Sequence, residues 1–321
     1  MSPRTVAVTG ATGFIGPHVV RRLSGDGWRV RVLTRRSPPP DAALLAGPSV
    51  EAVQGSLDDP SALRRLVRGV DAVVHVAGMV KARSRAEFFR VNADGVARLV
   101  EAAAAEPPAP RFVLISSLAA REPGLSAYAA SKRAGETALI ESGAALPSWT
   151  VLRPPVVYGP GDRQTLAFFR WVSRGIGPVL GPEGARVSLL HVDDLAALVA
   201  AVLDEGGEAV RGLIGEPDDG QPGGHTWPAL VAAAAGCFGR RARVLRVPRT
   251  ALQAAGLANR LLCLFPGFRP MLTPDKVREV RHPDWVCDAR PLIERTAWRP
   301  RTPIGPGFAG TIAWYRRHGW L

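Results

Sequence analysis

Cysteine, lysine and tyrosine are scarce in this sequence, which has three of each among 321 residues. Cys237, Cys263 and Cys287 lie far apart and lack zinc-type spacing. We therefore predict no disulfide framework and no metal site, and expect a reducing, cytoplasmic environment. No apolar run reaches the 18 residues typical of a membrane-spanning helix. The first strand is expected from about residue 4, so no signal peptide is expected.

Acidic residues are outnumbered by basic ones, and the formal net charge is +13. Such a balance can mark binding to nucleic acid or to an anionic membrane. However, only three of the 41 basic residues are lysines, and the arginines are spread along the chain. This pattern favours a compositional bias over one binding patch, so no nucleic-acid partner is predicted. The 46% hydrophobic and 21% charged composition is typical of a globular protein.

The most informative stretch is Val6-Ala-Val-Thr-Gly10-Ala-Thr-Gly13-Phe-Ile-Gly16, in which three glycines follow a short apolar run. A glycine after a strand permits a tight turn, a second lets the backbone approach a pyrophosphate, and a third allows close helix packing. The N–H groups at the start of the next helix then face the phosphate charge. This spacing predicts a dinucleotide site, although an ordinary strand-to-helix turn is the alternative.

Short apolar runs continue to alternate with amphipathic segments up to residue 153. We predict further strands at 28–34, 50–53, 71–76, 111–115 and 149–153, and helices between them, including a long one at 86–105 and another at 128–140. This alternation predicts an α/β fold with a Rossmann-type doubly wound parallel sheet. Residues 1–155 are expected to bind the dinucleotide. Residues 156–321 form a smaller substrate-binding region, with 186–205 packing back on the Rossmann core.

The end of the second strand predicts which dinucleotide binds. An acidic residue there would hold the 2′-hydroxyl of NAD, whereas arginine accommodates the 2′-phosphate of NADP. The chain has Thr34-Arg35-Arg36, and the next acidic residue is Asp41. We therefore predict NADP over NAD, with Arg35 and Arg36 as phosphate or adenine contacts. Two solvated arginines in an arginine-rich chain are the alternative.

The strongest chemical signal is Tyr128-Ala-Ala-Ser-Lys132. A spacing of four places both side chains on one face of a helix. A nearby ammonium stabilises a phenolate, so Lys132 is expected to lower the pKa of Tyr128 and make it an acid–base group. Ser116 and Ser117 follow the fifth predicted strand, at the sheet edge where ligands of parallel sheets bind. Either hydroxyl could contact a substrate carbonyl, or cap the local backbone.

Several stretches together resemble the extended or atypical short-chain dehydrogenase/reductase superfamily, in the branch that holds nucleotide-sugar epimerases, dihydroflavonol reductases and 3β-hydroxysteroid dehydrogenases. They occur in the family's order over about residues 4–200: the glycine stretch, Val74-His-Val-Ala-Gly78, Val91-Asn92-Ala-Asp-Gly95, the serine pair, Tyr128 and Lys132, Arg153-Pro-Pro-Val-Val-Tyr-Gly159, and His191-Val-Asp-Asp194.

The resemblance implies a catalytic set of Ser117, Tyr128 and Lys132. Tyr128 would donate a proton to a ketone, Lys132 would hold the nicotinamide ribose, and Ser117, the second serine of its pair, would orient the carbonyl. His191 and Asp194 match a motif that is more often structural. The implied cofactor contacts are Gly10, Thr12, Gly13, Phe14, Ile15, Arg35, Arg36, Ser56, Leu57, Ala77, Gly78, Tyr128, Lys132, Pro154 and Val157.

Two departures from the family pattern bear on this set. Where relatives often have an aspartate near the adenine, this chain reads Gly55-Ser56-Leu57-Asp58, so the contact comes from Ser56 or shifts to Asp58. Pro17 lies inside the first predicted helix, which is tolerable only in the first turn. Asn92 would support the site from the long helix, or be satisfied within the core.

The substrate is the least predictable feature. Epimerases of the superfamily grip a nucleotide diphosphate with arginines, for which this chain offers Arg186 alone. Aromatic residues at 168–171 and the apolar run 261–268 favour a lipophilic substrate, although each aromatic could equally be core. We predict an NADP-dependent oxidoreductase acting on a ketone or secondary alcohol of a long-chain or steroid-like molecule. The alternatives are a nucleotide-sugar epimerase or dehydratase, and a non-catalytic NADP-binding scaffold.

A final expectation concerns partners other than the substrate. Five basic residues precede the apolar run: Arg240, Arg241, Arg243, Arg246 and Arg249. Basic residues beside an amphipathic helix suit peripheral contact with the inner face of an anionic membrane, with a solvated surface as the alternative. The sequence does not fix the oligomeric state, and a homodimer is one option.

Overall fold

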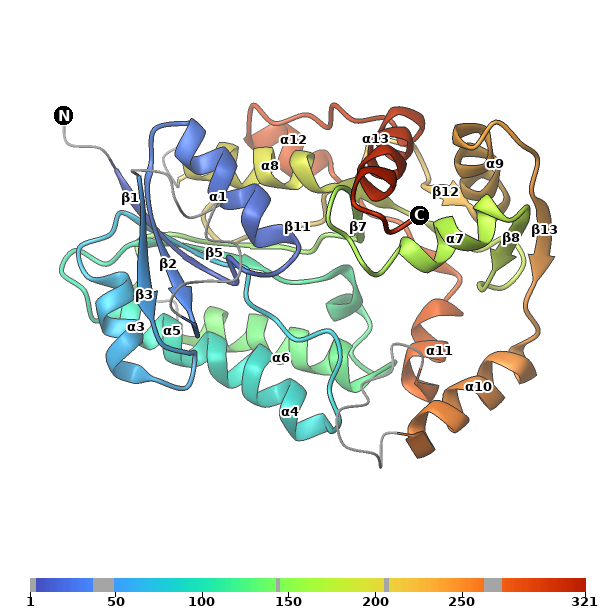
Figure 1. Ribbon diagram of the computed structural model, residues 1–321. Coiled ribbons are helices and arrows are strands. Elements are labelled where there is room, and N and C mark those ends of the chain that lie inside the picture. Colours follow the sequence, from blue (N-terminus) through green and yellow to red (C-terminus); the bar gives the residue numbers. More distant parts are fainter. Residues whose placement is uncertain (1–3, 37–48, 143–144, 205–207, 263–272) are drawn as a thin grey trace.

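The computed structural model describes residues 4–36, 49–142, 145–204, 208–262 and 273–321. Seven parallel strands form its central sheet in the order β11-β6-β5-β4-β1-β2-β3 (Figure 1). The strand order reverses between β1 and β4, as in doubly wound folds, so the predicted α/β class is confirmed. The strands are β1 (Thr5–Thr9), β2 (Arg29–Thr34), β3 (Val50–Gln54), β4 (Ala72–His75), β5 (Arg111–Ile115), β6 (Trp149–Leu152) and β11 (Leu213–Gly215).

Helices cover both faces of this sheet (Figure 1). One face carries α1 (Ile15–Gly25), α8 (Val192–Asp204) and α12 (Arg290–Arg295), and the other carries α3 (Pro60–Val67), α5 (Gly95–Ala104) and α6 (Ala127–Ser142). Alternate residues of one strand enter different cores: Val6 and Val8 face α1, whereas Ala7 faces α3 and α5. This double burial explains why the strands read as continuous apolar runs.

The six predicted strands are confirmed, but β11 was not predicted. It contains only three residues, follows Gly212, and ends in Gly215, so it lacks the apolar run that marked the others. Its register with β6 pairs Leu213 with Thr150 and Gly215 with Leu152. The sheet therefore takes its last strand from beyond residue 156.

The predicted helix over 86–105 is interrupted. It consists of α4 (Arg85–Phe89), a π-helical turn at Arg90–Asp94, and α5. Such π turns widen a helix locally and often occur at functional sites. Here the turn contains Asn92, which is buried and contacts the loop after β4.

A third core lies in the C-terminal half of the chain. Tyr158, Phe169, Phe308 and Tyr315 are fully or almost fully buried there. Short strands pair as β7 (Val156–Tyr158) with β10 (Leu189–His191), β9 (Arg186–Val187) with β12 (His225–Thr226) and β14 (Asp284–Trp285), and β8 (Ile176–Val179) with β13 (Arg243–Arg246). The remaining helices are a 3₁₀ turn at Leu118–Arg121, α7 (Leu166–Ser173), α9 (Trp227–Cys237), α10 (Arg249–Leu262), α11 (Pro274–Val280) and α13 (Ile304–Arg317).

Among the described residues, no helix has both the length and the hydropathy needed to cross a bilayer. Cys237 and Cys287 are free thiols. Cys263 and most of the apolar run 261–268 lie outside the described residues.

Candidate active site

The glycine stretch forms a tight turn between β1 and α1. Gly10 has φ +74°, and a Cβ on it would lie 2.5 Å from the Ala77 nitrogen at the end of β4. A Cβ on Gly16 would lie 2.1 Å from the Gly10 carbonyl oxygen. Both positions therefore exclude any side chain. Gly13 differs because it is exposed, and its N–H donates to the Gly10 oxygen at 3.0 Å.

The start of α1 lacks any side-chain cap and has no acidic residue in its first turn. Thr12 and Gly13, which precede it, are exposed. Its first N–H groups are consequently available to an anion, as the dinucleotide fold requires for the pyrophosphate. Pro17 falls in this first turn, where a missing N–H removes no intrahelical bond.

Arg35 and Arg36 directly follow β2 at the carboxyl edge of the sheet, and both are exposed. The Thr34 hydroxyl bonds both to the backbone oxygen of Arg36, at 2.9 Å, and to its nitrogen, at 3.3 Å. This contact fixes the turn after β2. Neither guanidinium forms an ion pair with any residue that the structure describes, and Asp41 lies outside those residues.

The segment expected near the adenine is held by Arg98. Its guanidinium donates to the Leu57 oxygen and to the Asp58 carboxylate, both at 2.7 Å. Asp58 is thus engaged within the protein, whereas the Ser56 hydroxyl only accepts from the Asp58 N–H at 3.2 Å. Of the two predicted adenine contacts, Ser56 therefore has the side chain that is more available to a ligand.

Asn92 fixes the loop that follows β4. Its amide accepts from the Met79 N–H at 2.7 Å and donates to the Met79 oxygen and to Ser131, both at 2.9 Å. Gly78 is exposed in this loop, and a Cβ on it would lie 3.7 Å from Lys132 Nζ. The predicted contacts Ala77, Gly78 and Lys132 are therefore close together.

Lys132 is buried, with 6% of its surface exposed, and its Nζ donates to the Ile115 carbonyl at 2.9 Å. Burial lowers its pKa to about 8, opposed by the Glu136 carboxylate. For Tyr128, burial raises the pKa to about 12; the neighbouring Ser117 hydroxyl opposes this shift and the Glu279 charge adds to it. The expected lowering of the Tyr128 pKa by Lys132 is not found: burial is the largest cause of the shift, and the Lys132 ammonium donates to the Ile115 carbonyl.

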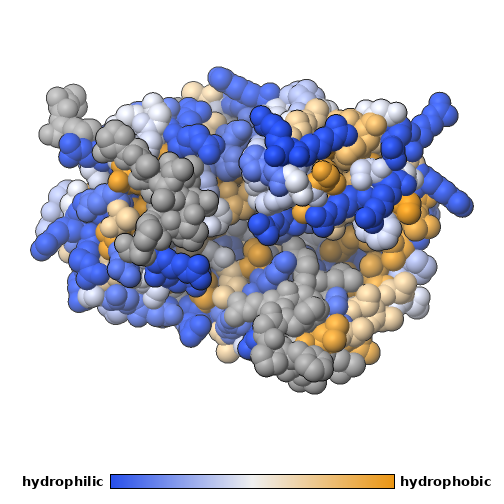
Figure 2. Space-filling view, viewed as in Figure 1, coloured by the Kyte–Doolittle hydropathy of each residue, from blue (hydrophilic) through white to orange (hydrophobic). Residues whose placement is uncertain are grey.

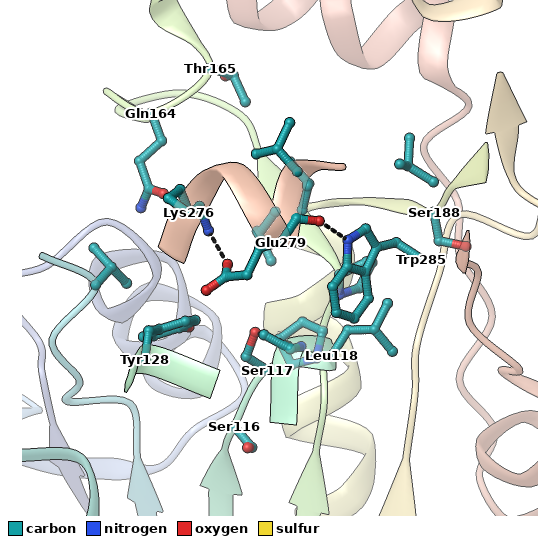
Figure 3. A pocket seen from close by; sticks show the side chains of 18 of the residues that line it. Ser116, Ser117, Leu118, Tyr128, Gln164, Thr165, Ser188, Lys276, Glu279 and Trp285 are labelled. Carbon is teal, nitrogen blue, oxygen red and sulfur yellow. Dashed lines mark hydrogen bonds and ion pairs between the residues drawn. The ribbon is translucent and has the colours of Figure 1, made fainter. Parts of the chain in front are cut away.

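The two serines have different surroundings. Ser116 donates to the Glu136 carboxylate at 2.5 Å, and Arg153 holds that carboxylate with bonds of 2.9 and 2.6 Å. Ser117 instead accepts from the Ala119 N–H at 3.2 Å and lies beside Tyr128 in the lining of a cavity (Figure 3). Of the pair, Ser117 has the position from which it can share a ligand with Tyr128.

These groups border a cavity of about 340 Å³. Of the residues predicted as contacts, Phe14, Ile15, Ser117, Tyr128, Pro154 and Val157 line it. Most of the lining is apolar, but it is formed by residues other than those on which the sequence prediction rested. Phe169 is buried in the third core, Trp171 is 46% exposed elsewhere, and neither borders the cavity. The apolar lining instead includes Val80, Leu118, Val156, Val187, Trp227, Val280 and Trp285.

Two charged residues in the lining were not predicted, namely Lys276 and Glu279 of α11. Figure 3 shows both facing the cavity beside Tyr128 and Ser117. Lys276 is one of only three lysines in the chain, and this scarcity was a signal that could have identified it.

Asp194 and Arg186, which were not placed in the catalytic set, form hydrogen bonds with the backbone of other segments. The Asp194 carboxylate accepts from the N–H groups of Arg301 and Thr302 at 3.1 and 3.0 Å. Arg186 is exposed and donates to the Gly223 oxygen at 2.9 Å, outside the cavity lining. No group of His, Cys, Asp and Glu in the described part of the chain is arranged to hold a metal ion.

Comparison with known proteins identifies the family and agrees with the fold. Residues 6–214 match the family model of the NAD dependent epimerase/dehydratase family. A ceramide reductase of Caulobacter vibrioides is 42% identical over 317 residues, covering 98% of this chain and 96% of the relative. The crystal structure of gox2253 has a TM-score of 0.77 at 23% identity over both full chains. Bordetella bronchiseptica WbmH, solved with NAD⁺, has a TM-score of 0.74 at 21% identity, covering 98% of this chain and 99% of that one.

Proposed function

The chain belongs to the NAD dependent epimerase/dehydratase family and is an NAD(P)-dependent reductase, and on that premise we propose that it reduces a ketone of a long-chain, ceramide-like lipid with NADPH. The observation that carries this proposal is an apolar cavity of about 340 Å³ in which Tyr128 and Ser117 lie side by side. An apolar lining with few polar groups suits a lipophilic ligand. The similarity to a ceramide reductase over nearly the whole chain supports the same class of substrate.

The chain's own residues suffice for the proton transfer that such a reduction needs. NADPH, when bound, supplies the hydride. Tyr128 would donate the proton to the carbonyl oxygen, because a pKa of about 12 keeps its hydroxyl protonated at neutral pH. Ser117 would donate a hydrogen bond to the same oxygen. Lys132, beside Gly78, would hold the cofactor ribose. The protonated tyrosine is the form that ketone reduction uses, whereas alcohol oxidation uses the phenolate as a base.

The choice of NADPH over NADH rests on Arg35 and Arg36. Both extend from the carboxyl edge of β2, where the fold places the adenosine ribose, and guanidinium groups bind phosphate well. The uncapped α1 terminus and the exposed Thr12 and Gly13 suit the pyrophosphate of either dinucleotide.

Epimerisation of a nucleotide sugar is the second candidate, favoured by the family model and by the fold of WbmH. Against it, Arg186 lies outside the cavity lining and is engaged with Gly223. A site for a nucleotide diphosphate needs unpaired cationic groups, and among the described residues the lining offers only Lys276, paired with Glu279 at 2.5 Å.

One experiment separates these functions. The purified protein is incubated with NADPH and either an N-acyl long-chain ketone or a nucleotide sugar, and both cofactor absorbance and products are followed. Reduction consumes NADPH in proportion to the alcohol formed, whereas epimerisation leaves its total unchanged. Isomerised sugar without consumption of NADPH would overturn the proposal.

We further propose that β13 and α10 touch an anionic membrane when the enzyme collects its substrate. All four residues of β13 are exposed, and its two arginines flank two apolar residues, Arg243-Val-Leu-Arg246. Leu257 of α10 is 56% exposed. Figure 2 shows hydrophobic residues gathered on the side of the molecule that carries these elements. Co-sedimentation with anionic vesicles at low salt, lost at high salt and absent with neutral vesicles, is expected; absence of binding to anionic vesicles would remove this proposal.

A further inference from the structure

Lys276 and Glu279 are the only charged side chains in the described lining of the cavity. They lie one turn apart on α11, and their ammonium and carboxylate are 2.5 Å apart. Lys276 Nζ lies 5.6 Å from the centre of the Tyr128 ring. In Figure 3 the Glu279 carboxylate points toward Tyr128 and Ser117, where the reacting carbonyl would bind.

The protein anchors Glu279 firmly. The residue is 4% exposed. One carboxylate oxygen accepts a short bond from Ser126, the residue before α6, and the other accepts from Lys276. Its backbone oxygen accepts from the Trp285 indole at 2.7 Å. A carboxylate has about four acceptor sites, so two remain for a ligand.

Stability does not explain this pair. Burying the Glu279 carboxylate costs several kcal/mol, whereas the Lys276 side chain is 34% exposed, and apolar residues in place of such a pair often stabilise a protein as well or better. The pair also raises the pKa of the neighbouring Tyr128 through the Glu279 charge. Its position in the lining, facing the reacting groups, points instead to recognition of a ligand.

On the basis of the proposed function, we propose that Glu279 and Lys276 bind an uncharged hydrogen-bonding group, a hydroxyl or an amide N–H, on the carbon atoms next to the reacting ketone. Glu279 accepts the hydrogen bond and Lys276 donates one. A hydroxyl matches both, because its single oxygen donates and accepts. A trans amide engages Glu279 through its N–H. An anionic group such as a phosphate is disfavoured, because the pair has no net charge and the carboxylate faces the ligand.

The cavity therefore has an apolar part and a part that forms hydrogen bonds. The apolar walls bind hydrocarbon and discriminate weakly, since each methylene group contributes only about 0.8 kcal/mol. The buried Glu279 carboxylate discriminates more strongly, because a ligand without a donor would leave its two remaining acceptor sites unfilled. We infer that α11 selects ketones that carry a neighbouring donor over plain long-chain ketones.

The test compares two substrates of equal chain length, an N-acyl ketone with a free hydroxyl beside the carbonyl and a plain ketone without donors. The wild-type enzyme is expected to prefer the first. In Glu279→Gln, the ratio of the two kcat/KM values is expected to fall about 10–100-fold, the range for hydrogen bonds to charged groups. Glu279→Asp should restore part of the ratio. The matched control is Asp275→Asn, which makes the same change on the same helix outside the cavity lining.

A purely structural role would lower kcat/KM for both substrates by the same factor and leave the ratio unchanged, which would overturn the inference. Failure of the proposed function has a different signature, because the wild type would then consume NADPH with neither ketone. Binding still tests the inference in that case. Trp227 and Trp285 line the cavity and report ligands by fluorescence. Equal affinity of the wild type for a hydroxylated N-acyl lipid and a plain lipid would contradict the proposal.

Discussion

On the cofactor side of the cavity, the chain shapes its site mainly with backbone: Gly10 and Gly16 admit no side chain, and the first N–H groups of α1 have no side-chain cap. On the substrate side, Lys276 and Glu279 of α11, together with Trp285, reach the same cavity from the far end of the chain. The first arrangement suits the pyrophosphate of any dinucleotide, and sequence changes there are limited by geometry. The second consists of side chains that can be exchanged, which is where specificity can evolve on a constant fold.

This difference between the cofactor side and the substrate side predicts that the proton transfer can be abolished without loss of cofactor binding. Tyr128→Phe keeps the ring but removes the hydroxyl that would protonate the ketone. Turnover of the keto-lipid is expected to fall about 10²–10⁴-fold, the usual contribution of general acid catalysis. Affinity for NADPH, measured by fluorescence titration, should change only a few-fold. Undiminished turnover in this variant would show that Tyr128 is not the proton donor.

The cofactor side should be intolerant of a single methyl group. Gly10→Ala forces a side chain to φ +74° and into contact with the Ala77 nitrogen. A loss of roughly 2–5 kcal/mol in the free energy of unfolding is expected from the conformation and the clash together. Gly25→Ala in α1 is the matched control, since a Cβ there meets nothing within 4 Å. That variant should be neutral or up to about 1 kcal/mol more stable in urea unfolding. Similar stability of the two variants would contradict the described turn.

The same contrast explains what the sequence could predict. The glycine stretch, the six strands and the Tyr128/Lys132 pair are local patterns, in which neighbouring residues determine the geometry. Lys276 and Glu279 carry no such pattern, because their place in the cavity depends on how α11 packs against Ser126 and Leu125. The raised pKa of Tyr128 was missed for the same reason. Spacing along a helix brings Lys132 near it, but burial is a property of the whole fold.

A smaller effect is expected where the cofactor side does use side chains. Replacing Arg35 and Arg36 together by alanine should weaken NADPH binding about 10–100-fold through loss of contacts with the 2′-phosphate, and should change NADH binding little. The measurement compares the dissociation constants of NADPH and NADH for the wild type and the double variant. Equal losses for NADPH and NADH would mean that these arginines do not select the phosphate.

Lys132 connects the two sides, and its burial predicts a modest but distinctive effect on stability. Its pKa falls from 10.5 unfolded to about 8 folded, so between these values the unfolded chain binds more protons. The free energy of unfolding attributable to this residue therefore rises with pH across that window, and the full cost of burying the charge is present below about pH 8.

Replacing Lys132 with methionine removes that cost, which is on the order of 3 kcal/mol for a shift of this size. It also leaves the Ile115 carbonyl without its donor, at a cost of about 1–3 kcal/mol. The variant without cofactor should consequently be about 1 kcal/mol more stable than the wild type at pH 7, and lose this advantage by pH 10. Urea unfolding of both proteins at the two pH values measures the difference. The prediction would be wrong if the variant were less stable than the wild type at pH 7 and the difference in free energy of unfolding did not change with pH. Burial of the Lys132 ammonium would then carry no cost in stability.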